Sequence, residues 1–350
     1  MLVDICNKLA EDHSITIFTI YAKGEFEKEL SNKVTLKSLY KYRYDEMSKL
    51  KRMLLPISIF FRKRGIYKKI KNNYDTEVAF LEGPITNIFG TKNPRTKKIA
   101  WIHNDISLVF GSGFKAKIKK LLNKNVYKKY SDLVFVSNDN LKKFEDTYDM
   151  DNKKHVVYNY INPASVIAKA SLESVDYINS DIDGQVNFVS VCRIVEQKAI
   201  ERLIDVHLKL ISDGVKYKIY VVGDGPLKES MEDRIIQNNI ADSFVLLGAK
   251  DNPYPYIKCA DVFCLFSYYE GYPMVLEEAK ILSKYIAITD TSAREVLRNY
   301  DNKFIVENSE DGIYKGIKEI VENKDKYLKN NKEYIYSNAG IMRQIQEILK

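Results

Sequence analysis

The sequence predicts an α/β protein with two doubly wound domains, each built on a parallel β-sheet. In the amino-terminal half, short apolar segments at residues 77–83, 98–104 and 132–138 alternate with helical patterns, which is typical of a parallel sheet. In the carboxy-terminal half, residues 261–266 form a nearly continuous apolar run, as expected for a strand that is buried on both faces. The length of 350 residues, 45% of them apolar, suits about two domains with cores of their own.

The remaining elements follow in a regular order. The chain opens with a predicted helix, in which Leu2, Ile5, Cys6 and Leu9 have helical spacing, and a strand follows at residues 15–20. Apolar residues become scarce between positions 162 and 185, which indicates a linker, and a helix with one apolar face is predicted at 341–349. The expected limits are 1–162 for the first domain, 163–185 for the linker, 186–330 for the second domain and 331–350 for a carboxy-terminal helical segment.

Two glutamates flank the start of the helix predicted after the strand at 261–266. The first, Glu270, lies beside backbone N–H groups of Gly271, Tyr272 and Met274 that can face an anion such as a phosphate. Ligands of open α/β sheets bind at the carboxyl ends of the strands, which is where this loop is placed. We therefore expect a ligand site here. The alternative is an ordinary helix start with two surface acids.

The second glutamate, Glu278, lies at the edge of an apolar stripe formed by Val275, Ala279 and Leu282. A carboxylate at the rim of a buried face needs hydrogen-bond donors. The vicinal hydroxyls of a ribose would supply a pair of donors, and a neighbouring Arg or Lys would also serve. Glu277 lies nearly opposite this stripe, so its carboxylate is predicted to be solvated.

Residues 267–280 resemble the EGxPxVLxEA signature of the retaining glycosyltransferases of family 4. Three further segments that are similar to motifs of this family follow the family's order, at residues 188–204, 220–227 and 246–266. The resemblance implies the GT-B fold, in which two Rossmann-like domains face a cleft. It also implies that the carboxy-terminal helix returns to pack on the first domain.

The same resemblance implies roles for single residues. Arg193 and Lys198 would hold the diphosphate of a nucleotide-sugar donor and stabilise the charge that develops on it. Glu270 would contact the donor sugar, and Glu278 would hold the ribose. The expected donor site is completed by Gly248 and Ala249 near the nucleobase and by Gly271, Tyr272, Met274 and Val275 around Glu270.

His103 is the candidate for chemistry in the first domain. It follows a predicted strand and resembles the family's histidine near the sugar and the acceptor; the alternative is a structural histidine bonded to the backbone. Glu82 also ends a predicted strand and is a second acceptor-side candidate. The expected catalytic residues are therefore Glu270, His103, Arg193 and Lys198.

The sequence departs from the family pattern in several places, one of which is residues 290–297, where the family commonly has a glycine-rich turn. Cys192 and Ala199 replace the glycines expected on either side of the diphosphate-binding residues, and their side chains are predicted to lower donor affinity or to displace the loop. At the amino end, the usual first strand and its glycine-rich loop are absent. Either the sequence is a shortened version of a longer product, which we expect, or its first domain is built differently.

The net charge of +8 is distributed unevenly. Residues 41–130 contain 22 Lys or Arg against 6 Asp or Glu, an excess that indicates an anionic partner. Residues 51–72 and 114–130 mix these cations with apolar residues, as do segments that bind an anionic membrane surface. The alternative is a solvated, lysine-rich surface. No zinc-binding spacing or helix-turn-helix pattern is present, so nucleic acid is not the expected partner.

The remaining composition restricts where the protein works. Four cysteines show neither metal-ligand spacing nor a disulfide framework, which favours a reducing compartment. The sequence shows no signal peptide and no apolar run long enough to span a membrane. We expect a cytoplasmic protein, either soluble or peripheral at the inner face of the cell membrane. Neither a metal nor a cofactor is expected, because the two cations and a helix N-terminus can hold the diphosphate.

The function implied by the resemblance is retaining, metal-independent glycosyl transfer. A sugar would move from a nucleotide donor, most simply a UDP-sugar, to a hydroxyl of a glycan or lipid-linked acceptor. A capsule, a lipopolysaccharide or another surface polysaccharide would be the product. The alternative is a catalytically weak relative that acts as a partner or scaffold in a polysaccharide assembly complex.

Overall fold

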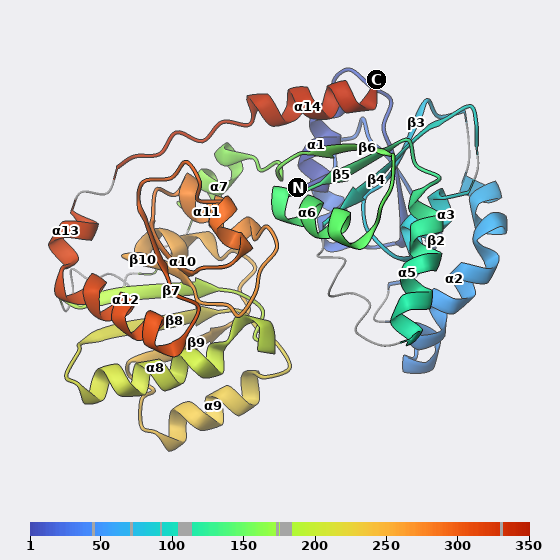
Figure 1. Cartoon of the computed structure of the whole chain (residues 1–350). Coiled ribbons are helices and arrows are strands. Elements are labelled where there is room, and N and C mark those ends of the chain that lie inside the picture. Colours follow the sequence, from blue (N-terminus) through green and yellow to red (C-terminus); the bar gives the residue numbers. More distant parts are fainter. Residues whose placement is uncertain are drawn as a thin grey trace. The chain divides into compact units, whose positions relative to one another are not determined.

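The chain folds into two units, which the ribbon drawing follows from the blue amino end to the red carboxyl end (Figure 1). The computed structural model describes residues 1–43, 46–70, 73–91, 93–103, 114–172, 175, 184–329 and 332–350. The first unit comprises Met1–Ile161 and Asn338–Lys350, and the second comprises Asn162–Ser337. Both units are α/β structures with parallel strands, which confirms the predicted fold class.

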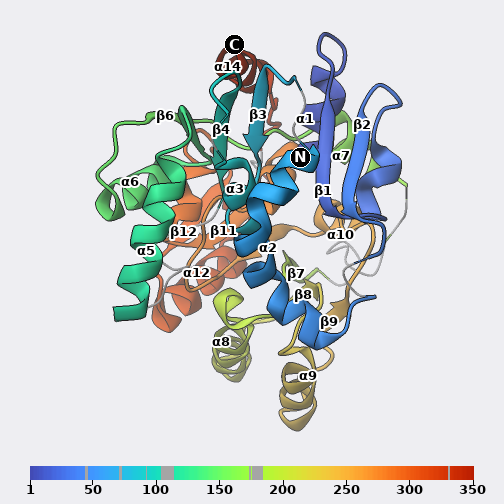
Figure 2. The same ribbon diagram turned by 90° about the vertical axis from the view of Figure 1, so that its right-hand side faces the viewer.

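The described strands of the first unit form two separate parallel sheets (Figure 2). One consists of β1 (Thr16–Tyr21) and β2 (Thr35–Tyr40). The other has the order β3-β4-β5-β6, with β3 at Thr76–Ala79, β4 at Lys97–Ile102, β5 at Asp132–Phe135 and β6 at Lys153–Val156. No strand in the described part of the chain pairs with both β1 and β3, so the single doubly wound sheet expected for this domain is divided in two.

Helices cover both sheets of the first unit. Helix α1 packs Cys6 and Ala10 against Val34, and the long helix α2 packs Ile59 and Ile66 against side chains of the β1–β2 sheet and of α3. The helical segments of this unit are α1 (Leu2–Leu9), the short 3-10 helix η1 (Glu25–Glu29), α2 (Lys49–Ile70), α3 (Pro84–Phe89), α5 (Phe114–Tyr127), α6 (Asn138–Thr147) and α14 (Ala339–Leu349). Helix α1 and strand β1 are the two elements predicted at the amino end.

The second unit is built on one six-stranded parallel sheet with the order β12-β11-β10-β7-β8-β9. Its strands are β7 (Val186–Val191), β8 (Tyr217–Val222), β9 (Phe244–Gly248), β10 (Val262–Leu265), β11 (Tyr285–Thr289) and β12 (Lys303–Val306). From β7 the chain first adds strands on one side and then crosses to the other side at β10. This reversal creates a topological switch point at the carboxyl ends of β7 and β10, which is where open α/β sheets bind ligands.

Strand β10 is buried on both faces, as its apolar run predicts. Val262 and Cys264 belong to one core, and Phe263 and Leu265 belong to the other. The helices that cover the two faces are α7 (Pro163–Lys169), α8 (Ile200–Ser212), α9 (Lys228–Gln237), α10 (Tyr254–Cys259), α11 (Met274–Ile281), α12 (Glu310–Glu322) and α13 (Lys324–Leu328), with 3-10 turns η3 (Glu196–Lys198) and η4 (Ser292–Glu295).

The chain passes between the units at residues 161–162 and 337–338. Helix α7 occupies the first part of the expected linker, because the Asn162 side chain accepts a hydrogen bond from the Ser165 N–H and Pro163 provides a favourable first turn. At the carboxyl end, α14 belongs to the first unit. There the Thr76 hydroxyl donates a 3.0 Å hydrogen bond to the Leu349 carbonyl, and the Lys97 ammonium donates one of 2.7 Å to the Ile348 carbonyl.

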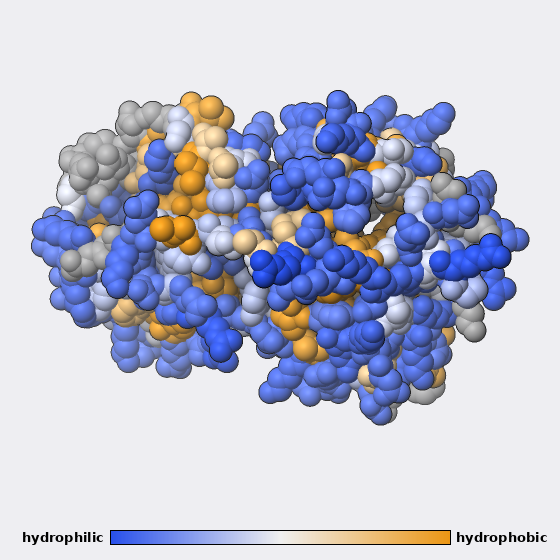
Figure 3. All heavy atoms as spheres, turned by 90° about the horizontal axis from the view of Figure 1, so that it is seen from above, coloured by the Kyte–Doolittle hydropathy of each residue, from blue (hydrophilic) through white to orange (hydrophobic). Residues whose placement is uncertain are grey.

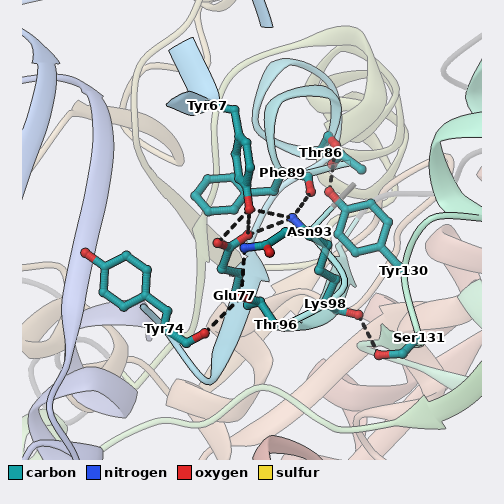
Figure 4. Close-up of polar contacts among 10 residues, drawn as sticks. All are labelled: Tyr67, Tyr74, Glu77, Thr86, Phe89, Asn93, Thr96, Lys98, Tyr130 and Ser131. Atoms are coloured by element: carbon teal, nitrogen blue, oxygen red, sulfur yellow. Dashed lines mark hydrogen bonds and ion pairs between the residues drawn. The ribbon is translucent and has the colours of Figure 1, made fainter. Parts of the chain in front are cut away.

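The core of the first unit contains a charged cluster of Tyr67, Glu77 and Lys98 (Figure 4). The Lys98 Nζ lies 2.7 Å from Glu77 Oε2, and both side chains are less than 5% exposed. The Tyr67 hydroxyl donates to the Glu77 carboxylate, and Lys98 also donates to the Phe89 carbonyl at 2.7 Å. Burial lowers the pKa of Lys98, whereas the bond to Glu77 acts in the opposite direction.

Seen from above, the surface shows mainly hydrophilic residues with small hydrophobic areas between them (Figure 3). Among the described residues, no helix combines the length and the apolar character that a membrane span requires.

Candidate functional site

The predicted donor-site residues of the second unit lie in loops at the switch point. Arg193 and Lys198 belong to the segment between β7 and α8, and Glu270 belongs to the segment between β10 and α11. Because β7 and β10 are adjacent and parallel, the loops that follow them emerge at the same edge of the sheet. The topology therefore brings residues that are more than 70 positions apart in the sequence to one place.

The loop after β7 is fixed by close contact with the glycine turn after β8. The Cys192 N–H donates to the Val222 carbonyl at 3.0 Å, and the Ile194 N–H donates to the Asp224 carbonyl at 2.9 Å. A Cβ atom on Gly223 would lie 1.9 Å from the Cys192 carbonyl oxygen, and one on Gly225 would lie 2.2 Å from that of Ile194. Only glycine allows this approach, so the turn determines where Arg193 can lie.

Lys198 and Glu270 form the centre of the site. The Lys198 Nζ lies 2.6 Å from Glu270 Oε1, and the buried Ser267 hydroxyl donates a 2.5 Å hydrogen bond to the same oxygen. The two loops are also joined by backbone contacts, since the Tyr268 N–H donates to the Gln197 carbonyl and the Gln197 amide donates to the Tyr269 carbonyl, each at 2.9 Å. The arrangement places one cation and one carboxylate together at the rim of the sheet.

Arg193 lies exposed in the same loop. Its guanidinium can hold two oxygens of a phosphate in a bidentate way, whereas the Lys198 ammonium acts as a point charge. An anion that enters this edge would compete with Glu270 for Lys198. The site can therefore bind a diphosphate with two cations, and it retains a carboxylate that accepts hydrogen bonds from hydroxyl groups.

The loop accommodates the two residues that replace expected glycines. Ala199 adopts the left-handed conformation, with φ of 51° and ψ of 37°, that glycine would adopt most easily, and it forms the N-cap of α8. Cys192 is partly exposed and accepts a weak hydrogen bond from the Ser190 hydroxyl, with an Oγ to Sγ distance of 3.8 Å. Burial raises the pKa of the Cys192 thiol, so the group stays neutral.

Glu278 lies in α11, where burial raises its pKa to about 7. The Tyr254 hydroxyl donates to its Oε1 at 3.4 Å, which is at the long limit for a hydrogen bond. A carboxylate in this environment is stabilised when further donors reach it. Two vicinal hydroxyls of a ligand would supply such donors.

The prediction that Glu277 is solvated is wrong. Its side chain is buried, lies 2.8 Å from the Lys280 ammonium and accepts a 2.5 Å hydrogen bond from the Tyr272 hydroxyl. Lys280 in turn donates to the Val296 carbonyl. The helical periodicity predicted that the side of α11 with Val275, Ala279 and Leu282 packs on the core. It could not show that the segment around Val296 covers the side with Glu277.

The other predicted donor-site residues lie in the same region. Gly248 ends β9 with a positive φ of 71°, its carbonyl accepts a hydrogen bond from the Gly223 N–H, and Ala249 follows it. Gly271 lies in the loop before α11. Met274 and Val275 form its first turn, and Pro273 is its N-cap.

In the first unit, His103 and Glu82 lie together. The His103 backbone N–H donates a 2.6 Å hydrogen bond to Glu82 Oε1, and the Asn140 amide donates to the His103 carbonyl. Burial lowers the pKa of the His103 imidazole to about 4, so this ring is neutral at pH 7. The neighbouring Asp105 lies outside the described residues.

The sequence did not indicate the residues that hold the loop after β10. Arg202, on the buried face of α8, donates to the Phe266 carbonyl at 2.8 Å, and its guanidinium lies 4.3 Å from the Tyr268 ring centroid. The Thr289 hydroxyl donates to the Ser267 carbonyl at 2.7 Å. A charged residue among the apolar positions of α8 was the available signal for Arg202.

Comparison with known proteins shows which family this region resembles. Residues 179–338 match the family described as Glycosyl transferases group 1. An uncharacterized glycosyltransferase of Methanocaldococcus jannaschii is 29% identical over 307 residues, which cover 83% of this chain and 72% of the relative. A second relative, from Campylobacter jejuni, is N-acetylgalactosamine-N,N'-diacetylbacillosaminyl-diphospho-undecaprenol 4-alpha-N-acetylgalactosaminyltransferase; it is 28% identical over 297 residues, or 80% of this chain and 76% of the relative.

Among solved structures, Anabaena HepE in complex with UDP and glucose superimposes with a TM-score of 0.74 at 15% identity, over 99% of this chain and 94% of HepE. At this identity the similarity concerns the fold. The residues around the switch point, from Arg193 to Glu278, all lie within the segment that matches the family. Residues 179–338, which carry the switch-point residues, are therefore similar to the glycosyltransferase group 1 family, and the fold of the chain is that of GT-B proteins.

Proposed function

We propose that this protein transfers a sugar from a UDP-sugar to a hydroxyl group of a glycan or a lipid-linked saccharide, with retention of configuration and without a metal ion. The observation that carries the proposal is the contact of Lys198 with Glu270 at the switch point, in the loop that also contains Arg193. UDP is supported by HepE, whose structure holds UDP and glucose. A lipid-linked acceptor is supported by the Campylobacter relative, which is named for a diphospho-undecaprenol substrate.

In the proposed reaction, the bond between the sugar and the diphosphate breaks and a bond to the acceptor oxygen forms on the same face of the sugar. Arg193 and Lys198 stabilise the negative charge that the leaving diphosphate gains, which lowers the barrier electrostatically. The proton of the acceptor hydroxyl passes to that diphosphate. Glu270 orients the sugar through its hydroxyls, and Glu278 holds the ribose.

We assign His103 and Glu82 to the acceptor side. A neutral imidazole can accept a hydrogen bond from a hydroxyl of the acceptor saccharide or donate one to it. Because the pKa of His103 is low, its imidazole is not a source of protons at pH 7. The scaffold alternative depended on the two replaced glycines and on the missing first loop. Ala199 keeps the backbone conformation of a glycine, so we favour an active enzyme.

Removing either cation tests the donor site. Arg193→Ala and Lys198→Ala are each expected to weaken UDP and UDP-sugar binding by about ten- to a hundredfold, because a charge-assisted hydrogen bond contributes about 1.5–3 kcal/mol. Uridine without phosphates should bind as it does to the wild type. Isothermal titration of the three ligands measures the effect, and Lys216→Ala, at an exposed position of the same unit, is the matched control. Wild-type affinity for UDP in both variants would exclude the assignment.

The raised pKa of Glu278 makes donor binding depend on pH. Ribose hydroxyls donate to the ionised carboxylate, and with a pKa of about 7 only about a tenth of the free protein carries it at pH 6. Affinity for a UDP-sugar should therefore rise about tenfold from pH 6 to pH 8. A UDP-sugar is the correct probe, since its diphosphate does not titrate in this range.

The variant Glu278→Gln separates this effect from other titrations. It should bind weakly at pH 8 and show a nearly flat profile, while Glu270→Gln should keep the pH dependence and mainly lose turnover. A profile for Glu278→Gln that remains as steep as the wild-type profile would place the titrating group elsewhere.

A further inference from the structure

Helix α2 of the first unit has apolar residues on two opposite faces. Ile59, Ile66 and Ile70 are buried and form one core with residues of α3 and of the β1–β2 sheet. At 100° per residue, Leu50, Leu54 and Phe61 lie about 180° from Ile59. A helix that packs on a core with one face normally carries polar residues on the other.

The opposite face of α2 is exposed. The exposed fractions are 62% for Leu50, 66% for Met53, 47% for Leu54 and 80% for Phe61. We call these four residues the outer stripe. Isolated apolar residues are ordinary on a protein surface, but Leu50, Met53 and Leu54 lie on adjacent turns of one face of α2, and Phe61 follows on the same face two turns later. Exposed apolar residues that cluster in this way mark interaction sites.

Charge around the outer stripe identifies the partner. Helix α2 contains eight Lys or Arg residues and no Asp or Glu, and helix α5, which also packs on α3, contains five Lys and no acid. Arg64 and Lys68 are exposed and follow the outer stripe on the same face of α2. Leu121 and Leu122 of α5 are exposed as well. The partner must therefore offer both an apolar interior and a dense negative charge.

We propose that α2 docks the first unit on an anionic lipid bilayer, with the outer stripe inserted at the boundary between headgroups and acyl chains. The flanking cations would lie at the level of the lipid phosphates, as in interfacial amphipathic helices. A second copy of this chain fits less well, because a symmetric contact would oppose the eight cations of α2 to the same eight. RNA would use the cations, but it gives no role to Leu50, Met53 and Leu54. The proposal does not depend on glycosyl transfer.

Vesicle binding by matched variants tests the apolar contribution. We expect the wild-type protein to co-sediment with phosphatidylglycerol vesicles and much less with phosphatidylcholine vesicles. Leu54→Ser combined with Phe61→Ser should weaken partitioning into anionic vesicles at least tenfold, because the transfer of two large apolar side chains from water into the lipid is lost. Ile236→Ser combined with Ile335→Ser, at positions of the second unit that are more exposed than Leu54 and Phe61 taken as a pair, should bind as the wild type does.

The charged contribution has its own pair of variants. Arg64→Glu combined with Lys68→Glu should weaken binding to anionic vesicles and reduce its sensitivity to salt. The control Lys216→Glu combined with Lys318→Glu carries the same charge change in the second unit. If the α2 and control variants bind alike, or if neutral vesicles bind as strongly as anionic ones, the proposal is wrong.

A fluorescence probe distinguishes insertion from adsorption. The chain has a single tryptophan, Trp101, which is buried, so Phe61→Trp adds one exposed reporter. Its emission should shift to the blue on addition of phosphatidylglycerol vesicles and should be quenched by lipids brominated on the acyl chains. Co-sedimentation without a blue shift would mean electrostatic adsorption only and would overturn the proposed insertion. Tight binding of an RNA or an acidic protein that is unaffected by Leu54→Ser and Phe61→Ser would overturn it too.

Discussion

Lys98→Ala is expected to lower the free energy of unfolding of the first unit by about 3–5 kcal/mol, since removal of one partner leaves a buried charge uncompensated. Glu77 is 4% exposed and would retain only the Tyr67 hydroxyl as a partner within the cluster. Trp101 lies in β4, as Lys98 does, so denaturant unfolding followed by tryptophan fluorescence reports on this unit.

A double variant separates the charge effect from lost packing. Lys98→Met combined with Glu77→Leu removes both charges and keeps most of the volume, and it should recover most of the lost stability. Lys154→Ala removes a surface pair with Glu145 and should cost less than about 1 kcal/mol. If Lys98→Ala were no more destabilising than Lys154→Ala, the cluster would contribute little to the fold.

Gly223→Ala and Gly225→Ala are expected to abolish donor binding and to destabilise the second unit by about 4 kcal/mol or more. The added Cβ atoms would lie 1.9 Å and 2.2 Å from the carbonyl oxygens of Cys192 and Ile194. These are backbone atoms, so no side-chain rotation relieves the overlap. The loop that holds Arg193 must shift as a whole. Thermal unfolding and titration with UDP measure the two effects.

Gly214 provides the matched control. It also has a positive φ, of 81°, but a Cβ atom there would meet nothing within 4 Å. Gly214→Ala should therefore cost about 1 kcal/mol, from the backbone conformation alone, and leave UDP binding unchanged. Equal melting temperatures and UDP affinities for Gly214→Ala and Gly223→Ala would show that the contact between the two loops is not needed.

Local patterns predicted much of the second unit. The apolar run at 261–266 is buried on both faces as β10, and its carboxyl end leads to Glu270, as the position of ligand sites in parallel sheets requires. Sequence order alone did not show that Lys198 would contact Glu270, because the contact depends on the pairing of β7 with β10. The burial of Glu277 was not predicted for a similar reason, because its partners depend on how α11 packs.

The first unit was harder to predict because apolar residues on two opposite faces of a helix leave no clear periodic pattern. In α2, Ile59 and Phe61 lie on nearly opposite faces, and both are apolar, so the pattern shows no clear apolar side. The eight cations were visible in the sequence, but the exposure of Phe61 was not. The Tyr67, Glu77 and Lys98 cluster was hidden too, because buried charges look like surface charges until the tertiary structure brings them together.

The division of the first unit's strands into two sheets affects how this unit can move. Strands β1 and β2 exchange backbone hydrogen bonds with each other and not with β3, and they are joined to the rest through side chains of α2 that contact Phe18 and Ile20. Side-chain packing permits small sliding shifts that a hydrogen-bonded ladder forbids. The two strands β1 and β2 can therefore open cooperatively while the rest of the unit stays folded. Contact of α2 with a surface would then alter the mobility of this pair before it altered that of the four-stranded sheet.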